Sequence, residues 1–69
     1  MIEVFKTNVL EMSQSKALVE KLLEQIPSSR INFDLQDCDK ILRVEAEHII
    51  PEKIIEVINA NGYQCQVLE

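Results

Sequence analysis

The side chains best suited to metal chemistry sit in one short polar segment and at one helix start. Cys38 stands between Asp37 and Asp39, and Met12 supplies a soft thioether sulfur further upstream. Thiol and thioether sulfur favour soft ions such as Cu(I), and carboxylates add oxygen ligands. Met12, Cys38, Asp37 and Asp39 are therefore the candidate ligands for Cu(I) or Zn(II). The competing interpretations are a thioether packed against the core and a solvated turn whose aspartates bond to nearby backbone.

The remaining reactive side chains do not form a catalytic constellation. Cys65 alternates with Val67 along a strand, which predicts a buried, inert thiol. His48 has no nucleophile and orienting carboxylate near it in the pattern, and Glu45 and Glu47 have no further acid placed to complete a catalytic pair. Glycine-rich phosphate loops and the HExxH motif are also missing from the sequence. We predict that the protein is not an enzyme, with no catalytic residues and no resident cofactor.

The net charge and the hydropathy pattern exclude several classes of binding partner. Twelve acidic residues against seven basic ones give a net charge of −5, which repels nucleic acids and anionic membrane surfaces. Apolar runs are too short to span a membrane. Met1 leads directly into a strand pattern rather than a basic and then apolar leader, so we expect a cytoplasmic protein. Two cysteines are too few for a disulfide framework.

Six elements must position these side chains. Alternation of apolar and polar residues predicts strands, and apolar spacing of three to four residues predicts helices. Ser13 or Ser15 offers the first helix a cap, Pro27 ends it, and Gly62 ends the second helix. The expected elements are a strand over 2–9, a helix over 16–25, strands over 31–35 and 41–46, a helix over 51–61 and a strand over 63–68.

The order β-α-β-β-α-β predicts one domain over residues 1–69. Two amphipathic helices must cover one face of the sheet, so the economical architecture is an α+β, ferredoxin-like two-layer sandwich with a four-stranded antiparallel sheet. In this topology the first strand-to-helix loop, the hairpin turn and the Gly62 loop lie at one end, with His48 at the other. The strand residues expected to face the helices are Ile31, Phe33, Leu35, Leu42, Val44, Cys65 and Val67.

This pattern resembles the heavy-metal-associated domain, the family of small copper chaperones and of the amino-terminal modules of copper-transporting pumps. The resemblance covers nearly the whole chain, and Gly62-Tyr63 is its most distinctive short piece. The other segments that carry it are Val19-Glu20-Lys21-Leu22, Ile31-Asn32-Phe33-Asp34-Leu35, Leu42-Arg43-Val44-Glu45, Pro51-Glu52-Lys53-Ile54-Ile55 and Cys65-Gln66-Val67.

The defining metal loop of that family is not carried over. Aligned through Val19-Glu20-Lys21, its Met-x-Cys-x-x-Cys motif places the methionine at Leu10, the first cysteine at Met12 and the second at Ser15. A serine hydroxyl is hard and neutral, so it does not replace a thiolate toward Cu(I). The resemblance therefore implies the fold of the family on a scaffold with a degenerate metal site.

One pair of side chains suggests an interface. If Ile2 and Val4 face the helices, then Phe5 and Ile41 lie together on the uncovered face of the sheet. An exposed apolar patch of this kind marks association, here with a protein partner or as a sheet-to-sheet homodimer. Scattered surface apolar residues are the competing interpretation.

Three functions remain open. The first is a small non-enzymatic binding or interaction module. The second is a weak soft-metal binding or trafficking protein that uses Met12 and Cys38. The third is an ACT-like regulatory domain of the same topology, which would bind an amino acid at a dimer interface. The sequence lacks the glycine that such domains usually place between the first strand and helix.

Overall fold

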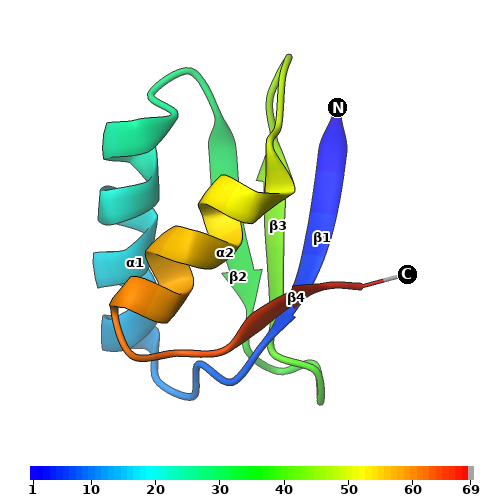
Figure 1. Ribbon diagram of the computed structural model, residues 1–69. Coiled ribbons are helices and arrows are strands. Elements are labelled where there is room, and N and C mark those ends of the chain that lie inside the picture. Colours follow the sequence, from blue (N-terminus) through cyan, green and yellow to red (C-terminus); the bar gives the residue numbers. More distant parts are fainter. Residues whose placement is uncertain (69) are drawn as a thin grey trace.

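The computed structural model describes residues 1–68 and contains the six predicted elements in the predicted order. Their bounds lie within a few residues of the expected ones, except that the first helix begins four residues earlier. The elements are β1 (Ile2–Thr7), α1 (Met12–Gln25), β2 (Arg30–Asp34), β3 (Ile41–Glu45), α2 (Pro51–Ala60) and β4 (Cys65–Val67) (Figure 1).

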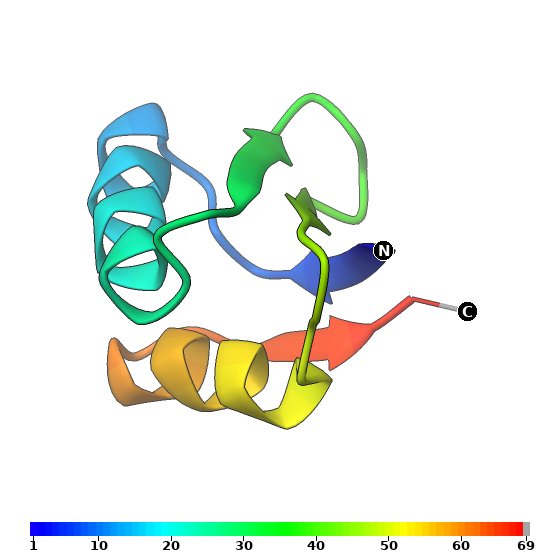
Figure 2. The same cartoon turned by 90° about the horizontal axis from the view of Figure 1, so that it is seen from above.

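The four strands form one antiparallel sheet in the order β2-β3-β1-β4. Both helices lie on the same side of the sheet, as the two views from the front and from above show (Figures 1 and 2). The α+β, ferredoxin-like sandwich is thereby confirmed, and its topology is compatible with a heavy-metal-associated-like fold. The order leaves β2 and β4 as the two edges of the sheet.

Interactions between residues close in sequence determine where the helices begin and end. The residue preceding α1 is Glu11, whose N–H donates to Gln14 Oε1 at 3.3 Å, so the expectation of a Ser13 or Ser15 cap is wrong. A side chain that reaches back three residues satisfies one of the free groups at a helix start. Pro51 begins α2, and Gly62 follows it with a φ of +90°, the left-handed conformation predicted for a glycine there.

The core lies between the sheet and the two helices. The strand residues expected to face the helices do so, with Leu42 and Val44 fully buried and the others packed partly buried against the cluster. The buried apolar cluster consists of Phe5, Val9, Leu18, Leu22, Leu42, Val44, Ile49, Ile54 and Ile58.

The face assignment of β1 is the main correction to the sequence expectation. Phe5 pairs with Leu42 and has 0% exposure, so it faces the helices rather than the open side. Ile2 is 59% exposed and Val4 is half-buried, which places the even-numbered residues of β1 outside. Ile41 does lie on the open face, opposite Lys6, but only 6% of it is exposed. Phe5 and Ile41 therefore do not form an exposed apolar pair.

Three loops gather at one end of the sandwich, as predicted, and are joined by hydrogen bonds (Figure 1). Thr7 links the end of β1 to the β2–β3 hairpin: its N–H donates to Asp39 O at 3.1 Å and its Oγ1 to Lys40 O at 2.6 Å. Asn8 Oδ1 accepts from Gln64 N–H at 2.8 Å, which links the same segment to the start of β4. The end that carries Met12 and Cys38 is therefore held by long-range contacts.

Within residues 1–68, neither helix has the length and apolar character needed to cross a membrane.

Candidate interaction site

The positions that correspond to the family's two thiols hold a thioether and a hydroxyl at the start of α1. Met12 is 68% exposed, so its sulfur is accessible. Ser15 is buried, and its Oγ donates to Met12 O at 2.7 Å. The hydroxyl proton of Ser15 is therefore donated to the helix backbone.

The Asp37-Cys38-Asp39 cluster lies in the β2–β3 hairpin, with one ligand atom from each residue within 4.8 Å of the others. Both carboxylates also have partners within the protein. Asp37 Oδ1 accepts from Asp39 N–H at 2.8 Å, and Asp39 Oδ1 lies 3.7 Å from Lys6 Nζ. These contacts are those of the predicted solvated turn. The role of Cys38 and Met12 as metal ligands remains a prediction.

The other sequence candidates are dispersed over the molecule. Cys65 is partly rather than fully buried, and this burial raises the pKa of its thiol from 9.0 to about 12. The low reactivity of this thiol remains a prediction. His48 lies on the loop before α2, at the end opposite Met12, where it lines a small apolar cavity of about 200 Å³ between the two helices. The sequence did not predict this cavity, because its walls come from both helices.

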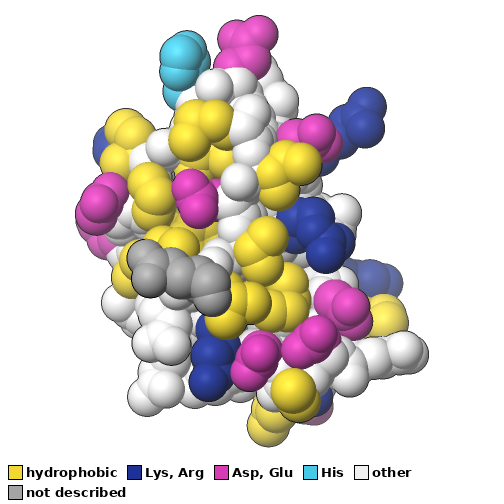
Figure 3. Space-filling model, turned by 90° about the vertical axis from the view of Figure 1, so that its right-hand side faces the viewer, with side chains coloured by type: hydrophobic (Ala, Val, Ile, Leu, Met, Phe, Trp, Pro, Cys, Tyr) yellow, Lys and Arg dark blue, Asp and Glu magenta, His cyan; other side chains and the backbone are white. Residues whose placement is uncertain are grey.

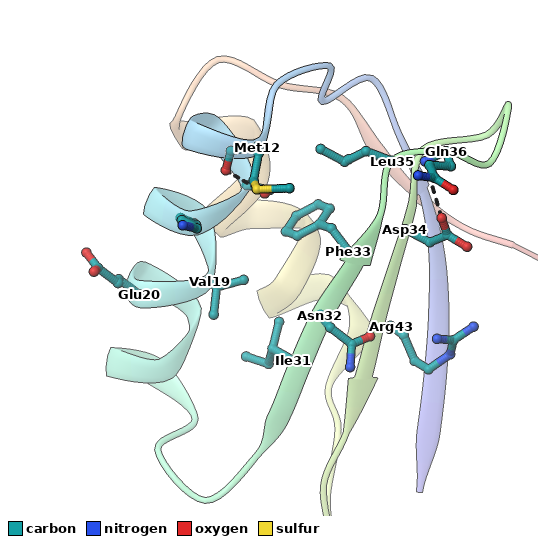
Figure 4. A pocket seen from close by; sticks show the side chains of 12 residues that line it. Met12, Val19, Glu20, Ile31, Asn32, Phe33, Asp34, Leu35, Gln36 and Arg43 are labelled. Carbon is teal, nitrogen blue, oxygen red and sulfur yellow. Dashed lines mark hydrogen bonds between the residues drawn. The ribbon is translucent and has the colours of Figure 1, made fainter.

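A larger feature, an open groove of about 870 Å³, runs between α1 and β2. Met12 and Val19 of α1 point toward Phe33 and Ile31 of β2, and these four side chains form an apolar part of the groove lining (Figure 4). Glu20 points away from it. We refer to this feature as the α1–β2 groove. Its apolar lining residues are Met12, Val19, Ile31, Phe33 and Leu35. The rest of its lining is polar or charged and consists of Ser15, Lys16, Glu20, Asn32, Asp34, Gln36 and Arg43.

The β2 strand presents free backbone groups to this groove. Met1 and Ala46 exchange both of their hydrogen bonds, at 2.8 and 3.0 Å. Bonded and non-bonded pairs alternate along an antiparallel ladder, so Val44 and Leu42 also direct their backbone groups toward β1.

It follows that Arg43 and Ile41 of β3 direct their backbone N–H and C=O groups toward β2. There Arg43 pairs with Asn32, and Ile41 pairs with Asp34. The N–H and C=O groups of the intervening residues, Ile31 and Phe33, point outward from the edge of the sheet. No strand of residues 1–68 pairs with that edge.

The uncovered face of the sheet carries a second, smaller apolar feature. Leu68 N–H donates to Val4 O at 2.9 Å, so these two residues lie side by side, and Leu68 is 38% exposed. With Ile2 they form an apolar strip among acidic and basic side chains (Figure 3). This strip replaces the Phe5–Ile41 patch expected from the sequence.

Comparisons with protein-family models, curated proteins and solved structures gave no match to this chain. The heavy-metal-associated resemblance therefore rests on the residues and the topology described above. Because an ACT-like domain has the same topology, the fold does not separate these two families.

Sequence reasoning missed the α1–β2 groove. The apolar residues of β2 were correctly assigned to the side of the helices, but no groove beside them was predicted. The usable signal was the predicted ferredoxin-like topology, in which the second strand lies at an edge of the sheet. An edge strand leaves outward backbone groups, and the side chains next to them are covered from one side only.

Proposed function

We propose that this protein is a small non-enzymatic interaction module that binds an extended protein segment in the α1–β2 groove. The observation that carries the proposal is the free edge of β2 beside a groove whose lining includes a cluster of apolar side chains. A segment laid along this edge would bond to the outward groups of Ile31 and Phe33 and so extend the sheet by one strand. This is the geometry of strand addition, in which backbone bonds supply affinity and pockets for alternate side chains supply specificity.

The lining of the groove defines the chemistry of the partner segment. Met12 and Phe33 offer an adaptable thioether and an aromatic ring to apolar side chains on the inner face of the added strand. Arg30, Asn32 and Asp34 are exposed on the outer face and favour polar or charged side chains there. The preferred partner is therefore an extended segment with alternating apolar and polar residues.

Selection of displayed random peptides against the protein, followed by amide chemical-shift mapping of a selected peptide, tests the proposal. We expect the Ile31 and Phe33 amides and the Met12 methyl group to shift most. Met12→Lys should weaken binding, since it places a charge in the apolar lining. Glu56→Lys on the exposed side of α2 is the control and should leave binding unchanged. Shifts confined to the Ile2–Val4–Leu68 strip, or a failure to select any peptide, would overturn the groove assignment.

The second proposal is weak binding of Cu(I) or Zn(II) through the hairpin cluster, with Met12 as a further ligand. It is supported by the close spacing of the ligand atoms of Asp37, Cys38 and Asp39. The test is anaerobic titration of the reduced protein against a chromophoric chelator, with Met12→Ala and Cys38→Ala variants. Competition that either variant abolishes supports the site, and absence of competition by the wild type refutes it.

A further inference from the structure

We propose that the strand received by the β2 edge is β2 of a second copy, so that two sheets join across a two-fold axis at Asn32. The inference rests on the proposed function, because it names the occupant of the α1–β2 groove. Its basis is the charge pattern of the five residues of β2, Arg30-Ile31-Asn32-Phe33-Asp34. This strand begins with a cation and ends with an anion, so an antiparallel pair of such strands brings opposite charges together at both ends.

Backbone geometry restricts the register of such a pair. The outward N–H and C=O groups belong to Ile31 and Phe33, so these residues must form the hydrogen-bonded pairs of the new ladder. The symmetric register sets Ile31 opposite the partner's Phe33 and Phe33 opposite the partner's Ile31. Asn32 then lies opposite the partner's Asn32 in the non-bonded position at the axis, where side chains approach most closely.

Charge pairing favours this register over registers shifted by two residues. Arg30 falls opposite the partner's Asp34, and Asp34 opposite the partner's Arg30, on the open face where both side chains are exposed. Opposite charges placed directly across a ladder stabilise it, and like charges destabilise it. A shift of two residues in either direction would set Arg30 against the partner's Asn32 or Gln36 and lose both pairs. In the isolated chain, residues 1–68 form no ion pair with Arg30 or Asp34, since the ion pair found there joins Lys6 and Asp39.

The apolar side chains on the inner face agree with self-pairing. Ile31 and Phe33 are half-buried, and an aromatic residue opposite a β-branched one is a favourable cross-strand pair. An exposed edge with free backbone groups also promotes uncontrolled association unless it is covered or charged. Pairing with a second copy covers the β2 edge of each copy and gives a closed, symmetric dimer.

A charge-exchange experiment tests the pairing. In Asp34→Arg, two arginines face each other at both ends of the interface, and in Arg30→Asp two aspartates do so. We expect each single variant to raise the dimer dissociation constant roughly tenfold or more, because two pairs are lost and two repulsions appear. The double variant Arg30→Asp/Asp34→Arg restores both pairs and should dimerise like the wild type. An equimolar mixture of the two single variants should form a heterodimer, since every opposed pair is then attractive.

Sedimentation velocity over a range of concentrations up to those used for NMR measures these equilibria. The matched controls are Glu56→Arg and Lys53→Asp, which make the same charge changes on exposed positions of α2 and should leave the dimer unchanged. All variants replace exposed side chains, and circular dichroism verifies that each is folded. Amide exchange provides an independent measure, because Ile31 and Phe33 should be protected in the wild type and not in the single variants.

Two results would overturn the inference. If the wild type sediments as a monomer at every concentration, the proposed dimer does not form. A dimer that responds to the β2 variants no more than to the α2 controls locates self-association on another surface. In either case, peptide mapping then decides the proposed function separately. Shifts at Ile31 and Phe33 would retain the groove for a different partner, and their absence would refute both proposals.

Discussion

Replacing Phe5 tests the face assignment of β1 and, with it, the structure of the core. Phe5 has 0% exposure and lies in β1, a strand hydrogen-bonded on both sides. Truncating a buried phenylalanine to alanine costs about 3–5 kcal/mol. A domain of 69 residues has a total stability of roughly 3–10 kcal/mol, so Phe5→Ala removes much or all of it.

Phe5→Leu is the more informative variant, because it retains an apolar side chain and leaves the protein folded. We expect a loss on the order of 1 kcal/mol, as for a typical core substitution. For a domain of this size, such a loss lowers the Tm by about 4–8 °C. Ile2→Ala is the matched control on the same strand. Since Ile2 is 59% exposed, its truncation should change the free energy of unfolding by no more than about 0.5 kcal/mol.

Urea denaturation followed by circular dichroism measures the free energies of unfolding, and thermal denaturation measures the Tm. Equal urea slopes for the wild type and the variants would show that the change lies in stability rather than in the surface exposed on unfolding. If Ile2→Ala destabilises the protein more than Phe5→Leu does, β1 faces the helices with its even-numbered residues. The core described above would then be wrong.

Four further predictions concern the loops and the thiols. Thr7→Val should lower the free energy of unfolding by about 1–3 kcal/mol in urea denaturation, because it deprives Lys40 O and Val9 N–H of their partner. Ser13→Ala is the control and should have little effect. Equal effects would contradict a structural role for the Thr7 hydroxyl. Gly62→Ala should lower the free energy of unfolding by about 1–2 kcal/mol, since its φ is +90°. The effect should come from backbone strain alone, because an added Cβ meets no atom within 4 Å. An unchanged free energy of unfolding would mean that the turn is not left-handed. At pH 8, iodoacetamide should modify the exposed Cys38 well before Cys65, whose burial raises its pKa to about 12; faster labelling of Cys65 would contradict its burial. The raised pKa means that the folded protein retains this proton between pH 9 and 12 while the unfolded chain releases it, so stability should fall with pH in that window, and less steeply in Cys65→Val.

Much of the fold was accessible from local patterns. The order of the six elements follows from apolar periodicity, and the left-handed turn at Gly62 follows from a glycine placed after the last apolar residue of a helix. The inward direction of β2, β3 and β4 was also predicted, because in each of these strands one alternating set is clearly more apolar. The start of α1 was not predicted, because Ser13 and Ser15 are favoured caps by residue type, whereas the residue that precedes the helix is Glu11.

Local residue patterns are enough to predict the succession of strands and helices, their approximate bounds and the inward faces of three strands. In β1 both alternating sets contain large apolar residues, Ile2 and Val4 in one and Phe5 in the other, so alternation alone could not choose. The choice depends on which residues β1 meets on β3 and β4, and those pairings join residues distant in the chain. The same holds for the candidate site: local pattern predicts that β2 is a strand, but its free edge exists only because β3 pairs with one side of it and no described strand pairs with the other.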